Sequence, residues 1–269
     1  YLSATPIPRS LSLVLYEGLD YTIIGESPKN RKTINTQMID HDKRSILHDN
    51  ISKILHDKEQ VYWVCSCIDY TESSESEYVQ GVYEDLSNRF STNSIGMLHG
   101  RVDSKENIKT MKKFVSGKIE ILVCTTMIEV GVDVANATCI VIEDPNRFGL
   151  SQLHQLRGRV GRSDKQSYCY LVCKNNLSDH ALYRLKALEL NSSGFKIAEE
   201  DLKLRGSGEY LGHKQSGANH NFKLATPDDA LNNYDLVRES MNCVDKIDEE
   251  SKNKLIKRWG KDSAETIQL

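Results

Sequence analysis

The sequence predicts an α/β fold in which a parallel sheet is covered by helices on both faces. Short apolar runs alternate with amphipathic segments between residues 33 and 173. The runs are continuously apolar, which is typical of strands that are buried on both faces of a parallel sheet. Turn-forming residues separate these runs from the amphipathic segments, as they do in successive strand–helix–strand units.

The first elements follow in order along the chain. "TINTQMI" at 33–39 predicts a strand, and an amphipathic helix follows at 42–56. "VYWVC" at 61–65 is short and fully apolar, so it predicts a buried strand. The serine- and glutamate-rich stretch at 71–77 is interpreted as a loop that caps a helix at about 78–90.

The next elements repeat the alternation. "SIGMLHG" at 94–100 predicts a strand that runs into a glycine turn, and Asp103 or Ser104 can cap the helix that follows. Gly117 is placed to end that helix, because glycine readily adopts the left-handed backbone found at helix ends. "IEILVCTT" at 119–126 predicts a further buried strand.

"TCIVIE" at 138–143 and "SYCYLVC" at 167–173 complete the strands, and a helix containing "HQLRGRVGR" lies between them. Beyond them the character changes. An amphipathic helix is predicted at 177–190, followed by a helix with Phe195, Ala198 and Leu202 on one side. That helix breaks into a glycine-rich loop, and two polar helices are predicted from residue 228 onward.

Composition excludes several classes of protein. A chain of 269 residues can form one large domain, or one domain with an appendage. The net charge is only −3, so any nucleic-acid-binding surface must be local. No apolar run approaches the length of a membrane span, and no signal-peptide pattern is present, so we expect no membrane partner. The chain opens abruptly without an initiator Met, and we expect it to be a fragment of a longer protein.

The cysteines indicate a reduced, cytoplasmic protein. The chain has seven of them and no paired CxxC motifs, so no zinc or other metal site is expected. Most lie in or beside apolar runs, where cysteine is typically a small core residue. These are Cys65, Cys124, Cys139, Cys169 and Cys173.

The stretch "HQLRGRVGR" at 154–162 is the first candidate site. It places three arginines and two glycines in nine residues. On a helix, Gln155, Arg159 and Arg162 would share one face, whereas Arg157 would point elsewhere. Two guanidinium groups beside a backbone cleared by glycine suit a polyphosphate. The alternative is a solvated basic helix.

A second candidate segment, "CTTMIEVGVD", follows the predicted strand at 119–126. Ligands of parallel sheets bind at the carboxyl ends of the strands. Thr125 and Thr126 could hold a phosphodiester backbone there. Gly131 would allow close approach, and Asp133 could accept a hydrogen bond from a sugar hydroxyl. The alternative is a strand followed by an ordinary turn.

These segments resemble a known family when they are taken together. "SATPIPRS", "TTMIEVGVD" and "QLRGRVGR" resemble, in this order, motifs III, V and VI of superfamily 2 helicases. "HGR" (His99, Gly100 and Arg101) resembles their DNA-contacting segment between motifs IV and V. The tail "IAEEDLKLRGSGEYLGHKQSG" is similar to the TRG motif of the RecG branched-DNA helicases and the transcription-repair coupling factor. The resemblance covers nearly the whole chain.

Details of these motifs bear on the choice between the two TRG families. "FGLSQLHQLRGRVGR" and "KQSG" are closer to RecG. The TRG loop usually has proline where Ser207 stands and threonine where His213 stands. Ser163, where RecG proteins often have glycine, is closer to the coupling factor. The transcription-repair coupling factor therefore stays open as the alternative translocase.

The resemblance implies a RecA-like, P-loop-NTPase-type parallel sheet, namely a helicase C-terminal lobe followed by a helical hairpin and loop tail. It divides the chain into four segments. These are the end of first-lobe motif III with the inter-lobe linker at 1–32, the RecA-like domain at 33–176, the TRG hairpin and loop at 177–225, and C-terminal helices at 226–269.

The resemblance also implies roles for individual residues. Arg159 and Arg162 reach across the inter-lobe cleft toward the β- and γ-phosphates of ATP, with Gln155 sensing the nucleotide or the attacking water. Gly131 and Asp133 lie on the nucleotide side of the same lobe. The residues expected to bind DNA are His99, Gly100, Arg101, Thr125 and Thr126. The residues expected to couple ATP hydrolysis to movement on DNA are Arg205, Glu209 and Gln215.

The function implied is that of the second motor lobe of an ATP-dependent helicase acting on branched or forked duplex DNA in fork reversal, recombination and repair. ATP and Mg²⁺ would be the cofactors. The chain has no G-x-x-x-x-G-K-[ST] loop and no acidic Mg²⁺-binding motif after a strand, so both cofactors would require the first RecA-like lobe of the same parent chain. We therefore expect this chain alone to be inactive. A non-catalytic DNA-binding module is the further alternative, although the complete Gln and Arg set of motif VI argues against it.

Overall fold

The computed structural model describes residue 22 and residues 32–66, 72–98, 104–125, 133–205, 236 and 247–259. These residues belong to two units, and each unit is described by itself. The first contains residue 22 and the described residues from 32 to 204, and the second contains the described residues from 205 onward. The four segments expected from the sequence, with their boundaries, stay predictions.

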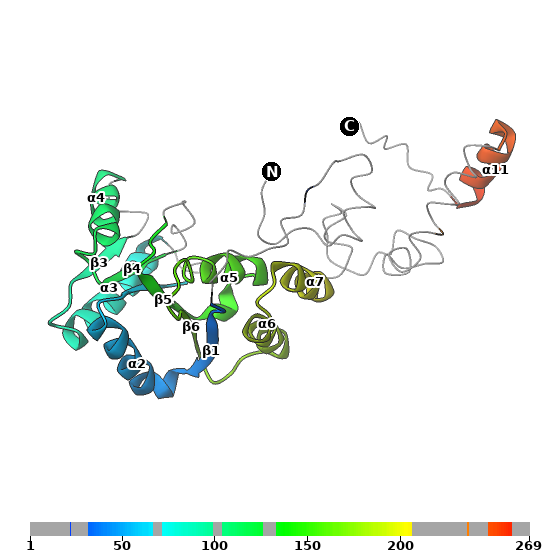
Figure 1. Cartoon of the computed structure of the whole chain (residues 1–269). Helices are drawn as coiled ribbons and strands as arrows, with labels where there is room; N and C mark the ends of the chain where they lie inside the picture. Colours follow the sequence, from blue (N-terminus) through cyan, green and yellow to red (C-terminus); the bar gives the residue numbers. More distant parts are fainter. Residues whose placement is uncertain are drawn as a thin grey trace. The chain divides into compact units, whose positions relative to one another are not determined.

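The first unit is built on one six-stranded sheet in the order β1-β6-β5-β2-β4-β3 (Figure 1). Every neighbouring pair of strands is parallel, which confirms the predicted parallel sheet. The strands are β1 (Asn35–Asp40), β2 (Gln60–Val64), β3 (Ile95–Leu98), β4 (Ile121–Cys124), β5 (Ala137–Glu143) and β6 (Tyr168–Cys173).

Helices connect these strands in chain order. The helices of the first unit are α2 (Arg44–His56), α3 (Glu72–Arg89), α4 (Ser104–Val115), α5 (Leu150–Arg157), α6 (Asp179–Leu190) and α7 (Gly194–Arg205), with 3₁₀ turns η1 (His41–Lys43) and η3 (Pro145–Arg147). Arg205, the last residue of α7, belongs to the second unit.

Helices cover both faces of the sheet, as the continuous apolar runs predicted. Val61 and Trp63 of β2, and Cys65 just after it, lie on the face where α2 and α3 pack. Tyr62 and Val64 point to the other face, where α4, α5 and α6 pack. Successive side chains of a strand alternate between faces, so a strand buried on both must be apolar at every position.

The cysteines predicted to be core residues are buried and free of disulfide bonds. Burial raises the pKa of the Cys124 and Cys139 thiols well above the ordinary value. A thiol that stays protonated is a poor nucleophile, so these cysteines act as small apolar residues. This confirms their interpretation from the sequence.

One helix boundary was predicted wrongly. The stretch at 71–77 was interpreted as a loop, but α3 begins at Glu72. Its glutamates are at residues 72, 75 and 77, near the start of the helix. Acidic residues are generally favoured in the first turns of helices, so a polar composition does not by itself predict a loop.

Two glycines offer a matched test of the backbone. Gly117 follows α4 with φ +74°, and a Cβ there would meet no atom within 4 Å. Gly81 lies inside α3 in similarly open space but has no such φ. We expect Gly117→Ala to lower the free energy of unfolding by about 1 kcal/mol because alanine resists the left-handed backbone. Gly81→Ala should raise it by about 0.5–1 kcal/mol. Thermal unfolding of both variants checks this, and a change of the same sign at both sites would contradict it.

In the second unit the structure describes α11 (Glu249–Trp259). Asp248 accepts hydrogen bonds from the backbone N–H and the hydroxyl of Ser251, which lower the pKa of its carboxyl group. Ion pairs join Glu249 to Lys252 and Glu250 to Lys254. This helix agrees with the polar helical tail expected after residue 228. Across the described residues, no helix combines the length and apolar character needed to cross a membrane.

Candidate functional site

The candidate site begins at α5, which starts at the carboxyl edge of the sheet after β5. The backbone N–H of Gly149 donates to Oε1 of Gln152 at 2.9 Å and so closes the first turn. Leu150, Leu153 and Leu156 are buried against the sheet. Gln155 is exposed on the helix, as a residue that contacts a ligand must be.

The helix observed here is shorter than the helix that the sequence predicted. α5 ends at Arg157, so Arg159 and Arg162 lie on a turn and do not share a helix face with Gln155. The N–H groups of Arg159 and Val160 donate three residues back, to Leu156 and Arg157. Val160 is fully buried, which anchors the turn in the core. We call residues 158–162 the arginine turn.

The two glycines of the arginine turn differ in their roles. Gly161 has φ +74°, in the left-handed region that favours glycine. Gly158 has an ordinary right-handed backbone with φ −66°. The need for glycine at 161 is therefore conformational, whereas the sequence alone suggested only clearance for a neighbour.

Arg162 and Asp133 are brought together by the fold. Nη1 of Arg162 lies 3.3 Å from Oδ1 of Asp133, and Nε donates to the Gly158 carbonyl at 3.2 Å. The Arg162 side chain is 30% exposed and that of Asp133 is 65% exposed. An ion pair this exposed contributes about 0–1 kcal/mol, so Arg162 can exchange Asp133 for another anion at little cost.

Tyr62 is a neighbour of this site that the sequence did not point to. It is buried in β2, in the same core cluster as Val160 of the arginine turn. Burial is the main cause that raises its pKa, and Cys124 adds to it, whereas the charges of Arg162 and Arg159 lower it. Tyr62 therefore stays neutral.

Arg157 has a structural role. It is only 4% exposed, and its Nη1 donates to the Leu188 carbonyl of α6 at 2.6 Å. Its Nη2 lies 3.0 Å from Nδ1 of His154. Burial lowers the pKa of the guanidinium. The sequence predicted that Arg157 points away from the site, and the structure shows that it joins α5 to α6.

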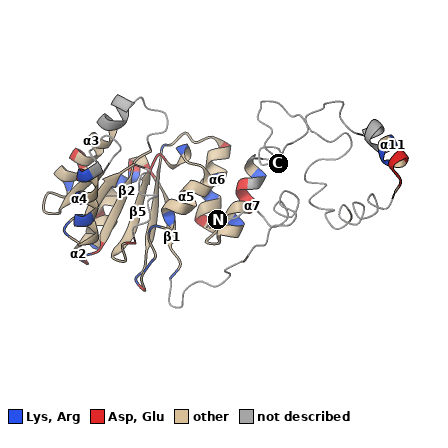
Figure 2. Ribbon diagram, turned by 90° about the horizontal axis from the view of Figure 1, so that it is seen from above, with Lys and Arg blue, Asp and Glu red and all other residues tan. Residues whose placement is uncertain are grey.

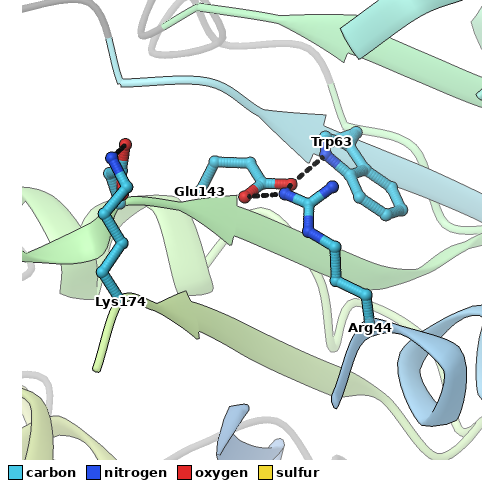
Figure 3. A network of polar contacts seen from close by, with 5 residues as sticks. Arg44, Trp63, Glu143 and Lys174 are labelled. Atoms are coloured by element: carbon cyan, nitrogen blue, oxygen red, sulfur yellow. Dashed lines mark hydrogen bonds and ion pairs between the residues drawn. The ribbon is translucent and has the colours of Figure 1, made fainter. Parts of the chain in front are cut away.

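A buried polar network holds the strand that leads into α5 (Figure 3). Glu143 is the last residue of β5. Its two carboxylate oxygens accept hydrogen bonds from Nη2 of Arg44 at 2.5 and 2.6 Å, and Oε1 also accepts from Nε1 of Trp63 at 3.0 Å. Burial raises the pKa of Glu143, while Arg44 and Trp63 act against that rise. Asp144 follows with φ 45° and pairs with Lys174 at 3.1 Å.

Further contacts hold α5 from the side of α6 and α7. Arg184 donates to the carbonyls of Phe148 and Asn146 at 3.1 and 3.0 Å, in the turn before α5. The Ser151 hydroxyl donates to Oδ2 of Asp201 at 3.0 Å, which joins α5 to α7. The arginine turn is therefore mounted on a helix that is fixed at several points.

Several predicted site residues lie outside the described part of the chain. They are His99, Gly100, Arg101, Thr126, Gly131, Glu209 and Gln215. Arg205 ends α7, and its side chain is not described. Thr125 is described, buried at the carboxyl end of β4. The roles assigned to all these residues stay predictions.

The sheet and the arginine turn define the C-terminal lobe of a helicase. Residues 42–164 match the family model described as "Helicase conserved C-terminal domain". Residues 191–259 match the model described as "ATP-dependent DNA helicase RecG, domain 3, C-terminal". The chain is therefore similar to the RecG helicases in both of the parts that these models match.

Individual relatives agree with this assignment. The ATP-dependent DNA helicase RecG of Escherichia coli K12 is 39% identical over 262 residues, which are 96% of this chain and 37% of the relative. The RecG protein of Thermotoga maritima is 41% identical over 91% of this chain and 31% of its own length. The chain thus spans about a third of the length of the curated relatives it matches.

A solved structure of RecG bound to a three-way DNA junction matches with a TM-score of 0.65 and 42% identity. The match covers 77% of this chain and 27% of that chain. It supports the RecA-like fold expected from the sequence.

Proposed function

We propose that this chain is the second motor lobe of an ATP-dependent helicase that moves on branched or forked duplex DNA. Its proposed roles are replication-fork reversal, recombination and repair in the cytoplasm. The observation that carries the proposal is the arginine turn, in which Arg162 forms an ion pair with the exposed carboxylate of Asp133, which a phosphate can replace. The matched relatives are named RecG, which favours this function over the transcription-repair coupling factor.

In the proposed reaction, ATP lies between this lobe and a first RecA-like lobe. Arg159 and Arg162 contact its β- and γ-phosphates and stabilise the charge that spreads over the transferred phosphoryl group. Arg162 would separate from Asp133 when the phosphates bind. Asp133 would then accept a hydrogen bond from a sugar hydroxyl, and Gly131 would allow close approach of the nucleotide. Gln155 is exposed toward solvent and senses the nucleotide or the attacking water.

Mg²⁺ would neutralise the phosphates and is assigned to the first lobe. Within the ranges that the structure describes, no group of three or more His, Cys, Asp or Glu residues is suited to hold a metal ion. The residues of this chain therefore contribute guanidinium groups to the site.

The proposed DNA contacts come from the ends of β3 and β4. These strands are paired in register up to Leu98 and Cys124, so their carboxyl ends lie side by side. His99, Gly100 and Arg101 follow β3, and Thr125 and Thr126 follow β4. This adjacency supports one continuous contact with a DNA strand.

We propose that Arg205, Glu209 and Gln215 couple the motor to DNA. The described start of this tail supports the idea, because α7 is joined to α5 through Asp201 and Ser151. A change at the arginine turn can therefore reach α7 through a partly buried hydrogen bond.

The activity of the isolated chain tests whether ATP hydrolysis requires the first lobe as well as this one. We expect no steady ATP turnover by this chain alone, with or without DNA, because the phosphate loop is on the other lobe. Protection of the β2 and β5 amides from hydrogen exchange would show that the chain is folded in the assay. Sustained turnover by the folded, contaminant-free chain would refute the proposal.

A further inference from the structure

We infer that the solvent-facing side of α4 is a second phosphate-binding surface, which holds a duplex arm of the branched DNA. This inference rests on the proposed function but concerns a surface remote from the nucleotide. The surface consists of exposed lysines on α4 and just after it, and we call it the α4 lysine face. Its members are Lys105, Lys109, Lys112, Lys113 and Lys118.

The charge of this face is local and of one sign. Between residues 104 and 118 the chain has these five lysines and a single acidic residue, Glu106. The whole chain has a net charge of −3, so the positive charge on α4 is opposite in sign to the net charge of the chain. Figure 2 shows blue segments along α4, at one end of the row of strands.

Four of the five lysines form no ion pair among the residues that the structure describes. Lys109, Lys112, Lys113 and Lys118 form no ion pair with any residue in the described ranges. The nearest carboxylate after α4, that of Glu120, accepts instead from the Ser94 N–H and the Asn93 amide. The ammonium groups of these four lysines therefore remain available to an external polyanion.

The spacing of the lysines fits a nucleic-acid backbone. Asn107 and Phe114 are buried on the inner side of α4, which leaves Lys105, Lys109 and Lys112 on the outer side. A helix rises about 1.5 Å per residue, so these three lysines span roughly 10 Å. One strand of DNA has a phosphate about every 3.4 Å along the axis, so the span matches about three phosphates.

The position of α4 makes this surface continuous with the proposed DNA contacts. β3 is the last strand of the sheet, and α4 packs against it on one side. The helix begins at Ser104, shortly after the proposed contact segment at 99–101 in the sequence, and β3 is paired with β4, whose carboxyl end precedes Thr125. A duplex arm that leaves the carboxyl edge of the sheet can therefore follow α4.

Contacts between lysines and phosphates affect the affinity for DNA and the position of the DNA on the protein. Lysine interacts with phosphate as a point charge and does not read bases. The α4 lysine face would therefore orient an arm of the junction without sequence preference.

Neutralising the face tests the inference. In the complete gene product, Lys109→Gln, Lys112→Gln and Lys113→Gln are combined, and binding to a three-way junction is measured over a series of salt concentrations. Each lost phosphate contact lowers the salt dependence by about 0.9 in the slope of log K against log salt concentration, so we expect a decrease of roughly 2 to 3. ATP hydrolysis without DNA should not change.

A matched variant controls for total charge. Lys43→Gln, Lys53→Gln and Lys58→Gln change three exposed lysines on and beside α2 and should leave the slope unchanged. An unchanged slope in the α4 variant, or an equal decrease in both variants, would overturn the inference. An equal loss on single-stranded DNA would also overturn it, because the occupant would not be a duplex arm. If the wild-type protein showed no helicase activity while the α4 slope still fell, the proposed function would fail and the phosphate surface would stand.

Discussion

Arg162→Ala, made in the complete gene product, is expected to lower DNA-stimulated ATP hydrolysis by on the order of a thousandfold or more. The guanidinium stabilises charge that is greatest in the transition state, so its removal affects turnover far more than binding. DNA binding depends on phosphate contacts spread over other surfaces and should stay near the wild-type level. Steady-state ATPase and fork-binding titrations on one preparation measure both effects.

Arg205→Ala is the contrasting variant. It should retain much of the ATPase activity and lose fork unwinding. The reason is that the substitution disrupts the coupling of ATP hydrolysis to DNA movement through α7, whereas the arginine turn is unchanged. If this variant lost both activities in equal proportion, Arg205 would be part of a structural cap over the sheet and the coupling role would be wrong. For Arg162→Ala, a parallel loss of ATPase and fork binding would be the contradictory result.

Glu143→Ala is expected to have the largest effect on stability, about 3–5 kcal/mol in the free energy of unfolding of the lobe. The Glu143 side chain is 3% exposed, and its loss leaves Arg44 and the Trp63 N–H without their carboxylate partner. A buried donor or charge that loses its partner incurs its full desolvation penalty. Hydrogen exchange of the β2 and β5 amides measures the change.

An exposed ion pair of the same lobe supplies the control. Lys43 and Asp40 lie 3.1 Å apart, with side chains 64% and 54% exposed. Asp40→Ala should change the same free energy by less than about 1 kcal/mol. Losses of similar size at the two sites would mean that burial of the Glu143 network does not stabilise the lobe.

Most of the sheet could be predicted from the sequence because burial on both faces requires continuous apolar runs. "VYWVC" and "TCIVIE" are β2 and β5 for this reason, with boundaries shifted by one residue. Helix ends were harder to predict. α5 ends at Arg157 because Val160 turns into the core and Gly161 adopts a left-handed backbone, and neither feature follows from helical spacing.

The candidate site was predictable only where its residues share a local pattern. Gln155, Arg159 and Arg162 lie in one short motif, whereas Arg162 meets Asp133 only through the fold. The network around Glu143 was missed because Arg44 is 99 residues away in the sequence. Taken alone, Arg44 and Glu143 each resemble an ordinary charged surface residue. The burial of Arg157 was missed because its partner is a main-chain carbonyl of α6, which leaves no signal in the side-chain pattern.

The central claim is that this lobe supplies the arginines of an ATP-driven motor that acts on branched DNA. Steady-state ATP hydrolysis by the complete gene product, with and without a three-way junction, tests it most directly. We predict strong stimulation by the junction, weaker stimulation by linear duplex of the same length, and loss of the stimulated rate in Arg162→Ala. Tight junction binding with no ATP turnover would contradict the claim and would identify the protein as a non-catalytic DNA-binding module.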